Sequence, residues 1–137
     1  MEIRDAVEAD ADRLAALTDA PTDVMRNLVH DRTVRVAADA ANRVQGFVSY
    51  DAQRETVYVT QLEGDGELCE RLLDEPTRFA ETEGMAVELL IGENDTETQA
   101  AAKRAGFTEH GLGPRFDGMR TVRYRWEPDG NVTAGGR

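Results

Sequence analysis

The 25 residues from Glu67 to Ile91, ELCERLLDEPTRFAETEGMAVELLI, decide the fold that this sequence predicts. Gly84 is a typical helix-ending residue, and Met85–Ile91 after it is apolar except for Glu88, as in a strand covered on both faces. Before Gly84, apolar residues recur on one helical face: Leu68, Leu72, Phe79 and Ala80. A helix of this kind, over Glu67–Glu83, provides the crossover that two parallel strands require. Pro76 lies inside it and is expected to kink or split it, because proline cannot donate a hydrogen bond to Leu72.

Upstream of this stretch the sequence predicts a strand, two helices and an antiparallel meander. A short strand begins at Ile3, and apolar residues at helical spacing follow the acidic segment Glu8–Asp12. A second, short helix starts near Pro21–Asp23 and ends near His30. Three strands come next, separated by short loops, at Thr33–Ala38, Val44–Tyr50 and Thr56–Leu62.

Downstream, Thr96 with Gln99 has the pattern of a capping box, and Gly106 can end the helix in a left-handed turn. Two final strands, Phe107–Gly111 and Met119–Trp126, enclose a loop over residues 112–118. The expected order is βααβββαβαββ, an α/β (α+β) mixed sheet with helices on both faces. We expect one domain over residues 1–126 and a flexible tail over 127–137.

Charge is the strongest compositional signal: 27 acidic residues against 16 basic ones give a net charge of −11, and Lys103 is the only lysine. This balance argues against nucleic acid as a partner. An acidic surface with one lysine suits a salt-rich, halophile-type cytosol, where screening relieves self-repulsion. The sequence has no membrane-length apolar run, and its single cysteine excludes an internal disulfide, so we expect a cytoplasmic protein.

Three local stretches, with their spacing, resemble the GNAT family, the GCN5-related N-acetyltransferases. Residues Ile3–Ala6, followed by an acidic helix start, resemble the opening "I-R-x-A-x-x-x-D" of that family. Val44–Phe47 resembles its "V-x-G-F" strand, where glycine relieves crowding. Lys103–Phe107 (KRAGF) resembles its "K-x-G-F" helix ending and is the most specific of the three. The resemblance spans Met1–Trp126 and implies acetyl transfer from acetyl-CoA to an amine.

The resemblance also implies a pyrophosphate site at the start of the helix after Thr56–Leu62, in a degenerate form of the motif "Q/R-x-x-G-x-G/A". Gln61–Gly66 (QLEGDG) matches the motif by letter, whereas the usual helix length, counted back from Gly84, places its last position at Cys69. We slightly favour the later alignment. The acidic residues around this segment would weaken phosphate binding: Glu63, Asp65, Glu67 and Glu70. The alternative is that Gly64–Gly66 is only a strand-to-helix turn.

The implied coenzyme-binding residues run from the strand end into the helix, with Asn94 beside the pantetheine arm: Val59, Thr60, Gln61, Gly64, Asp65, Gly66, Glu67, Leu68, Cys69 and Asn94. Strict counting places Asp95 at the position of Asn94, and a turn residue is equally expected there. The N–H groups of Val59–Gln61 would stabilise the thioester oxygen.

Glu63 is the candidate base, although a solvated loop acid is the simpler interpretation. The tyrosine acid of the family corresponds to Ala102, so the usual acid is missing.

Other candidate residues have simpler interpretations. His30 and His110 could act as bases but are more typical of surface histidines, and a catalytic zinc site is not expected. Tyr124 and Trp126 could line an acceptor groove or pack in the sheet, and Cys69 fits a buried apolar position.

Two alternatives to catalysis stay open, a GNAT-fold interaction or regulatory module and an acyl-CoA sensor without turnover. We expect the last strand pair to support a homodimer.

Overall fold

The structure is a computed structural model that describes residues 1–128. Twelve elements follow one another: β1 (Glu2–Asp5), a 3-10 turn (Glu8–Asp10), α1 (Ala11–Thr18), α2 (Thr22–Asp31), β2 (Thr33–Ala38), β3 (Val44–Gln53), β4 (Thr56–Glu63), α3 (Gly66–Glu83), β5 (Ala86–Gly92), α4 (Thr96–Arg104), β6 (Thr108–Phe116) and β7 (Met119–Trp126). The predicted order of strands and α-helices is confirmed. The predicted tail falls almost wholly on residues 129–137, which lie outside the described residues.

The seven strands form one sheet in the order β1-β2-β3-β4-β5-β7-β6. Within the described residues β4 and β5 are the parallel pair, and every other neighbouring pair is antiparallel. The helix α3 connects the two parallel strands, and it ends at Gly84, whose φ of 72° is left-handed. The crossover predicted from Glu67–Ile91 is therefore confirmed.

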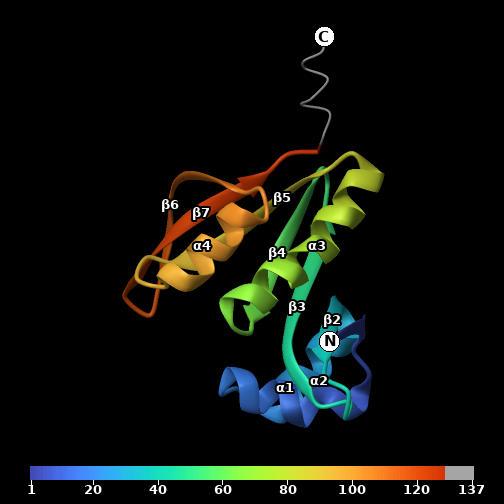
Figure 1. Cartoon of the computed structure of the whole chain (residues 1–137). Helices are drawn as coiled ribbons and strands as arrows, with labels where there is room; N and C mark the ends of the chain where they lie inside the picture. The colour runs from blue at the N-terminus through green and yellow to red at the C-terminus, as the bar shows by residue number, and fades with distance from the viewer. Residues whose placement is uncertain (129–137) are drawn as a thin grey trace.

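Helices cover both faces of the sheet, as β2 illustrates. Val34 and Val36 belong to the core cluster with α1 and α2. The alternate residues face α3: Ala37 belongs to the core cluster with that helix, and the Arg35 guanidinium contacts Glu75 of α3 at 2.8 Å. Figure 1 shows α3 and α4 running side by side across the sheet, with α1 and α2 gathered around the N-terminal strands.

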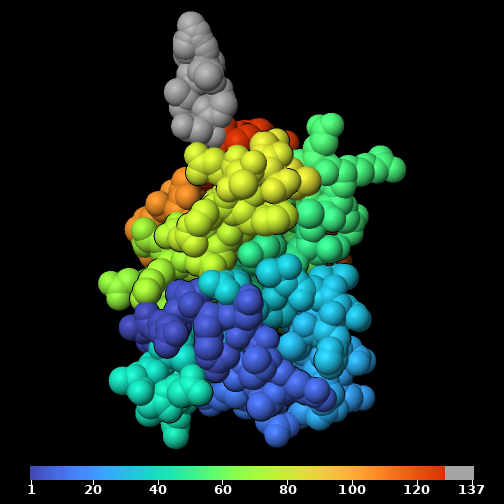
Figure 2. Space-filling model, turned by 90° about the vertical axis from the view of Figure 1, so that its right-hand side faces the viewer, coloured from blue at the N-terminus to red at the C-terminus, as the bar shows by residue number. Residues whose placement is uncertain are grey.

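The space-filling view shows how the N-terminal segments lie below α3. In Figure 2 the second half of α3 and the start of β5, in yellow, lie above the blue and cyan residues of the N-terminal third. None of the helices in residues 1–128 is long and apolar enough to span a membrane.

The helix α3 is not split at Pro76, one of the two outcomes that we expected there. It runs unbroken from Gly66 to Glu83, with the Pro76 ring buried. The Thr77 hydroxyl donates to the Leu73 carbonyl at 3.1 Å, one turn back. Tertiary packing of this apolar face outweighs the lost hydrogen bond. Phe79, predicted on the same helical face as Leu68, Leu72 and Ala80, is 40% exposed whereas those three are buried. The centroid of its ring lies 6.2 Å from that of Tyr50.

The start of α4 also differs from the prediction. Its N-cap is Asp95, whose carboxylate accepts from the Thr98 amide at 3.2 Å, so Thr96 does not form a capping box. The Gln99 side chain instead donates to the Gly92 and Glu93 carbonyls. The helix still ends as predicted, because Gly106 takes a left-handed φ of 98°.

The last hairpin has a longer strand than the sequence predicted. We expected a loop over residues 112–118, but β6 continues to Phe116 and the turn is only Asp117-Gly118. Both turn residues have positive φ, as a tight hairpin turn requires. Two register irregularities, on either side of Leu112, accommodate the glycines and the proline that made this segment resemble a loop.

Candidate functional site

The parallel strands β4 and β5 pair at one end and separate at the other. Their pairing runs from Thr56 with Ala86 to Val59 with Leu89 and stops there. Beyond this point β4 continues to Glu63 against β3, and β5 continues to Gly92 against β7. The edges of β4 and β5 that face each other therefore lack strand partners, which leaves backbone groups available in the middle of the sheet.

A β-bulge at Thr60 lies where β4 turns away from β5. Val59 pairs with Tyr50 and Gln61 with Ser49, so Thr60 is the extra residue of β4. Its hydroxyl lies 2.6 Å from the Ser49 hydroxyl, and Ser49 is fully buried. Bulges bend a strand and release it from pairing, so this one accounts for the separation of the two strands.

A hollow of about 230 Å³ opens from this separation on the face that α3 and α4 cover. Glu63, Asp95 and Thr98 line its mouth. Burial raises the pKa of Glu63, and the nearby charge of Asp95 raises it further. Gln61 also lines this hollow, and its side-chain oxygen is buried without a hydrogen-bond partner among the described residues. This side of the sheet is polar and acidic.

A second hollow of about 600 Å³ opens on the opposite face. Its lining side chains are mostly apolar, and they come from β4, β5 and the end of the last hairpin: Tyr58, Leu90, Phe116 and Met119. Glu88, Thr121 and Arg123 add polar groups. Both hollows share a lining from the separated strands: Val59, Thr60, Leu89, Leu90 and Gly92. The separation of β4 and β5 therefore faces a hollow on each side of the sheet.

The N-terminus of α3 lies beside the acidic hollow, and carboxylates already accept from its amides. The Gly66 N–H donates to the Glu97 carboxylate of α4 at 2.8 Å. The N-cap Asp65 accepts from the Leu68 amide at 2.8 Å. Helix N-termini attract anions, and here Glu97 supplies one from within the chain.

The hydrogen bonds at the start of α3 discriminate between the two alignments of the predicted pyrophosphate motif. The first intrahelical bond of α3 runs from the Cys69 amide to the Asp65 carbonyl, at 2.8 Å. The amides that this helix does not use internally are therefore those of Asp65–Leu68. This range fits the letter-for-letter alignment better than the later one, so the hydrogen bonds of α3 do not support our preference for Cys69.

Cys69 is a buried thiol. Its side chain is 1% exposed, and burial, with the charges of Glu63 and Asp95, raises its pKa to about 12. The thiol contacts the Gly64 carbonyl at 3.3 Å.

The backbone is crowded at Gly46 in β3, as we expected. A Cβ atom there would lie under 3 Å from the Glu63 carbonyl and the Leu68 side chain, so glycine lets the end of β4 and the start of α3 approach β3.

The remaining candidates lie away from the separated strands. Asn94 is exposed between β5 and α4 and does not line the hollow, whereas Asp95 does. His30 is exposed, 3.8 Å from Glu8, and His110 is exposed on β6. Within residues 1–128 no group of three or more His, Cys, Asp or Glu side chains could hold a metal ion.

Residues of the sheet and α4 that we weighed as functional belong to the packed core. Tyr124 is fully buried and lies 3.4 Å from Gln99, and Trp126 packs against Gly106. Ala102 is fully buried and offers no acidic group.

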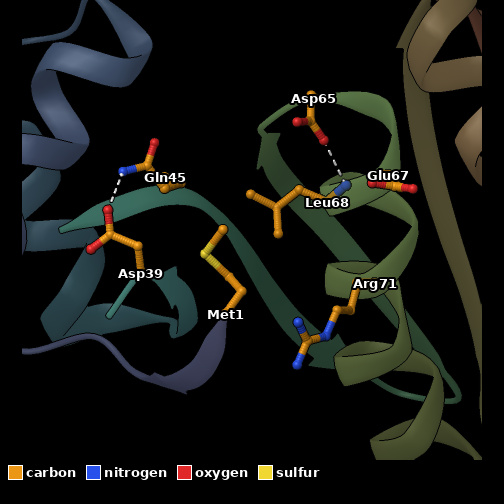
Figure 3. Close-up of a pocket in the computed structure, with 7 residues that line it drawn as sticks. All are labelled: Met1, Asp39, Gln45, Asp65, Glu67, Leu68 and Arg71. Carbon is orange, nitrogen blue, oxygen red and sulfur yellow. Dashed lines mark hydrogen bonds between the residues drawn. The ribbon is translucent and has the colours of Figure 1, made fainter. Parts of the chain in front are cut away.

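A third hollow, of about 550 Å³, lies on another side of the start of α3 (Figure 3). Leu68 projects from α3 toward Met1, and Arg71 reaches in from the next turn of the helix. On the opposite wall Gln45 donates to Asp39 at 3.1 Å. None of its lining residues belongs to the separated part of β4 and β5. It therefore lacks the free strand amides that acyl-transfer chemistry uses.

Two residues near the hollows were not predicted as site residues from the sequence. Glu97 lies in the first turn of the predicted helix at Thr96, where an acidic residue is ordinary, and nothing local indicates its contact with Gly66. Arg123 could have been found, because strand alternation in Met119–Trp126 places it on the face opposite Tyr124.

A mixed sheet with a bulged, separated parallel pair defines the class of fold, and solved structures place it among known proteins. No protein-family model matches the chain, and no curated protein matches its sequence. Ribosomal-protein-alanine N-acetyltransferase from Brucella melitensis superposes with a TM-score of 0.78 at 18% identity, over 93% of this chain and 99% of that one.

Two other solved structures have the same fold. A GNAT superfamily phosphinothricin acetyltransferase from Sinorhizobium meliloti, in complex with acetyl-CoA, gives a TM-score of 0.76 at 18% identity, covering 96% of this chain and 91% of that one. A spermidine N-acetyltransferase variant from Vibrio cholerae gives 0.76 at 13% identity, covering 97% and 96%. The chain therefore has the fold of the GNAT acetyltransferases.

Proposed function

We propose that this chain is an N-acetyltransferase that moves an acetyl group from acetyl-CoA to an amine by direct attack. The observation that carries the proposal is the separation of β4 from β5 at the Thr60 bulge, with a hollow on each face. Two substrates that enter from opposite faces could meet between the strands. The GNAT fold of the chain, shared with a protein bound to acetyl-CoA, supports acetyl-CoA as one of them.

The separated strands supply groups suited to each step of the transfer. The amine nitrogen attacks the thioester carbon, and N–H groups of Val59–Gln61, where β4 leaves β5, stabilise the oxygen as it gains charge. Glu63 takes the proton from the amine, and its raised pKa makes it a better base than an ordinary carboxylate. The C–S bond then breaks, and water protonates the departing thiolate because Ala102 offers no acid.

The α3 N-terminus is the proposed pyrophosphate site. Its candidate residues are those of the strand end and the first helical turn, Gly64 to Cys69. Asp95, which lines the smaller hollow, fits the place beside the pantetheine arm better than Asn94. Glu97 accepts from the Gly66 amide, so coenzyme binding requires this carboxylate to move aside. The acidic cluster would oppose phosphate in dilute buffer and less so in molar salt.

The contact between Glu97 and Gly66 also supports a second candidate function. A domain whose anion site is filled by its own carboxylate could act as an interaction or regulatory module, or as an acyl-CoA sensor. The buried Ala102 is consistent with loss of catalysis.

Calorimetric titration with acetyl-CoA in molar potassium chloride tests the enzyme against the module. We expect binding, and we expect Gly66→Val to abolish it while the fold survives, because the branched side chain would stand against the phosphate. Cys69→Gly is the comparison. The amide of residue 69 is already bonded within α3, so the affinity for acetyl-CoA should stay unchanged. The free energy of unfolding should fall by about 1 kcal/mol, because glycine is a poor helix former.

If the protein binds no acetyl-CoA in molar salt, the enzyme and the sensor both fail and the module remains. If Cys69→Gly improves affinity and Gly66→Val has no effect, the later alignment is correct.

Three further properties belong to the proposal. The charge of −11 supports a salt-rich cytoplasm as the location. Exposed Leu112 on the edge strand β6 supports a homodimer through the last hairpin. The single sheet over β1–β7 supports one domain for residues 1–126.

A further inference from the structure

We propose that the acceptor is an amine with an apolar body and a carboxylate, and that Arg123 selects it by binding the carboxylate. This inference rests on the proposed function and adds a substrate class to it. It concerns the larger hollow, on the face opposite α3 and α4.

The walls of this hollow suit an apolar body. Tyr58, Phe116 and Met119 all line it, and their side chains are 39%, 56% and 38% exposed. Large apolar side chains gathered on the surface of a strongly acidic protein commonly mark a binding site. The volume of about 600 Å³ accommodates a small organic molecule.

Arg123 gives this apolar hollow its charge preference. It is the only basic residue among those of residues 1–128 that line either hollow at the separated strands. Its side chain contacts the Glu88 carboxylate only weakly, at 3.4 Å. Glu88 is held more closely by Arg125, at 2.6 Å, and Arg125 also pairs with Glu127. Of the two arginines, Arg123 therefore has more donors left for a planar carboxylate.

The charges on the two faces of the sheet determine where the amine and the carboxylate of the ligand lie. The amine faces the separated strands at Thr60 and Gly92, beyond which lie Glu63 and Asp95. The carboxylate lies at Arg123 on β7, close to the amine, and the apolar body extends away from both against Leu90 and Met119. An amine without a carboxylate would leave the guanidinium with only its weak contact to Glu88.

The test compares three amines of the same apolar body: L-phenylalanine, L-phenylalaninamide and 2-phenylethylamine. Calorimetry measures their binding to the full chain without coenzyme, and thiol release from acetyl-CoA measures their transfer. We expect phenylalanine to bind roughly 10- to 100-fold more tightly than the other two, the range for a hydrogen-bonded charge pair. We expect the KM values to follow the same order.

Arg123→Gln should remove this preference, and Arg123→Lys should restore part of it, because lysine keeps the charge but not the planar fork. The control is Arg120→Gln, three residues earlier on β7 and therefore on the other face. It should keep the preference. Thermal unfolding of the variants checks that each is folded.

Binding and transfer separate the two proposals. Equal affinity for all three amines, or an unchanged preference in Arg123→Gln, would overturn the substrate class even if transfer occurs. A carboxylate preference that depends on Arg123, without thiol release, would support the substrate class while the proposed transfer fails.

Discussion

The two faces of the separated strands β4 and β5 differ in chemistry. On the α3 and α4 side the mouth carries Glu63 and Asp95, and Glu97 already occupies a helix amide. On the other side the lining is mostly apolar, and its charged residues are Arg123 and Glu88. One sheet thus presents an acidic, polar wall and an apolar wall at the same backbone opening. The comparison teaches that an overall charge of −11 does not describe the environment of either hollow.

Glu63→Gln should have the largest effect and should act only on the acidic face. If Glu63 is the base, the rate of transfer falls about 100-fold or more for every amine, because an amide cannot take the proton. Acceptor preference should not change. Thiol-release kinetics measure both, with Glu55→Gln, in the turn before β4, as the control. An equal loss of rate in the control, or no loss in Glu63→Gln, would remove Glu63 from this role.

The same variant makes a pH prediction with a definite sign. Burial raises the folded-state pKa of Glu63 above its unfolded value, so the native protein holds this proton more tightly than the unfolded chain does. Stability from this group is present below the unfolded pKa and is lost as pH rises through the raised pKa. Glu63→Gln should therefore unfold at a higher temperature than the parent at neutral pH. The difference should shrink as the pH falls below the raised pKa.

Substitutions at two glycines test whether ligand binding on one face of the sheet can be weakened without affecting the other face. Gly46→Ala presses on the Glu63 backbone and the Leu68 side chain, so it should lower the free energy of unfolding by about 1–3 kcal/mol. It should also weaken acetyl-CoA binding. Gly113→Ala is the matched change on the other face, where the new methyl meets the Thr121 and Leu90 side chains.

We expect Gly113→Ala to alter amine binding and to spare acetyl-CoA binding. Denaturant unfolding and the two titrations, done on both variants, measure these effects. If each variant weakens both ligands equally, the faces are not independent.

Glu97→Gln should have the smallest effect, an increase of roughly 2- to 5-fold in acetyl-CoA affinity, as expected for one charge at a helix N-terminus. The glutamine oxygen can still accept from Gly66, so the unfolding temperature should change little. The control is Glu81→Gln, which makes the same charge change in the last turn of α3. Equal gains in both variants would indicate a general effect of net charge, and a loss of affinity in Glu97→Gln would mean that Glu97 helps the coenzyme.

Most of the fold could be predicted because its signals are local. Apolar periodicity, Gly84 and Gly106 defined α3, β5 and the end of α4. The failures lie where distant contacts override a local preference. Pro76 does not split α3 because its helix face is buried, and β6 extends to Phe116 because pairing with β7 absorbs its irregularities.

The sequence by itself determined the order of the elements and the acidity of the surface. It also determined that Ala102 stands where the GNAT family usually has its tyrosine acid. Only the tertiary structure decided that β4 leaves β5 after Val59 and that Glu97 reaches the Gly66 amide. It also placed Arg123 beside Glu88 in an apolar hollow. The partners in these contacts lie 31 and 35 residues apart, so they depend on how α3 and α4 pack and on how β7 inserts beside β5. Local propensities carry no information about such distances.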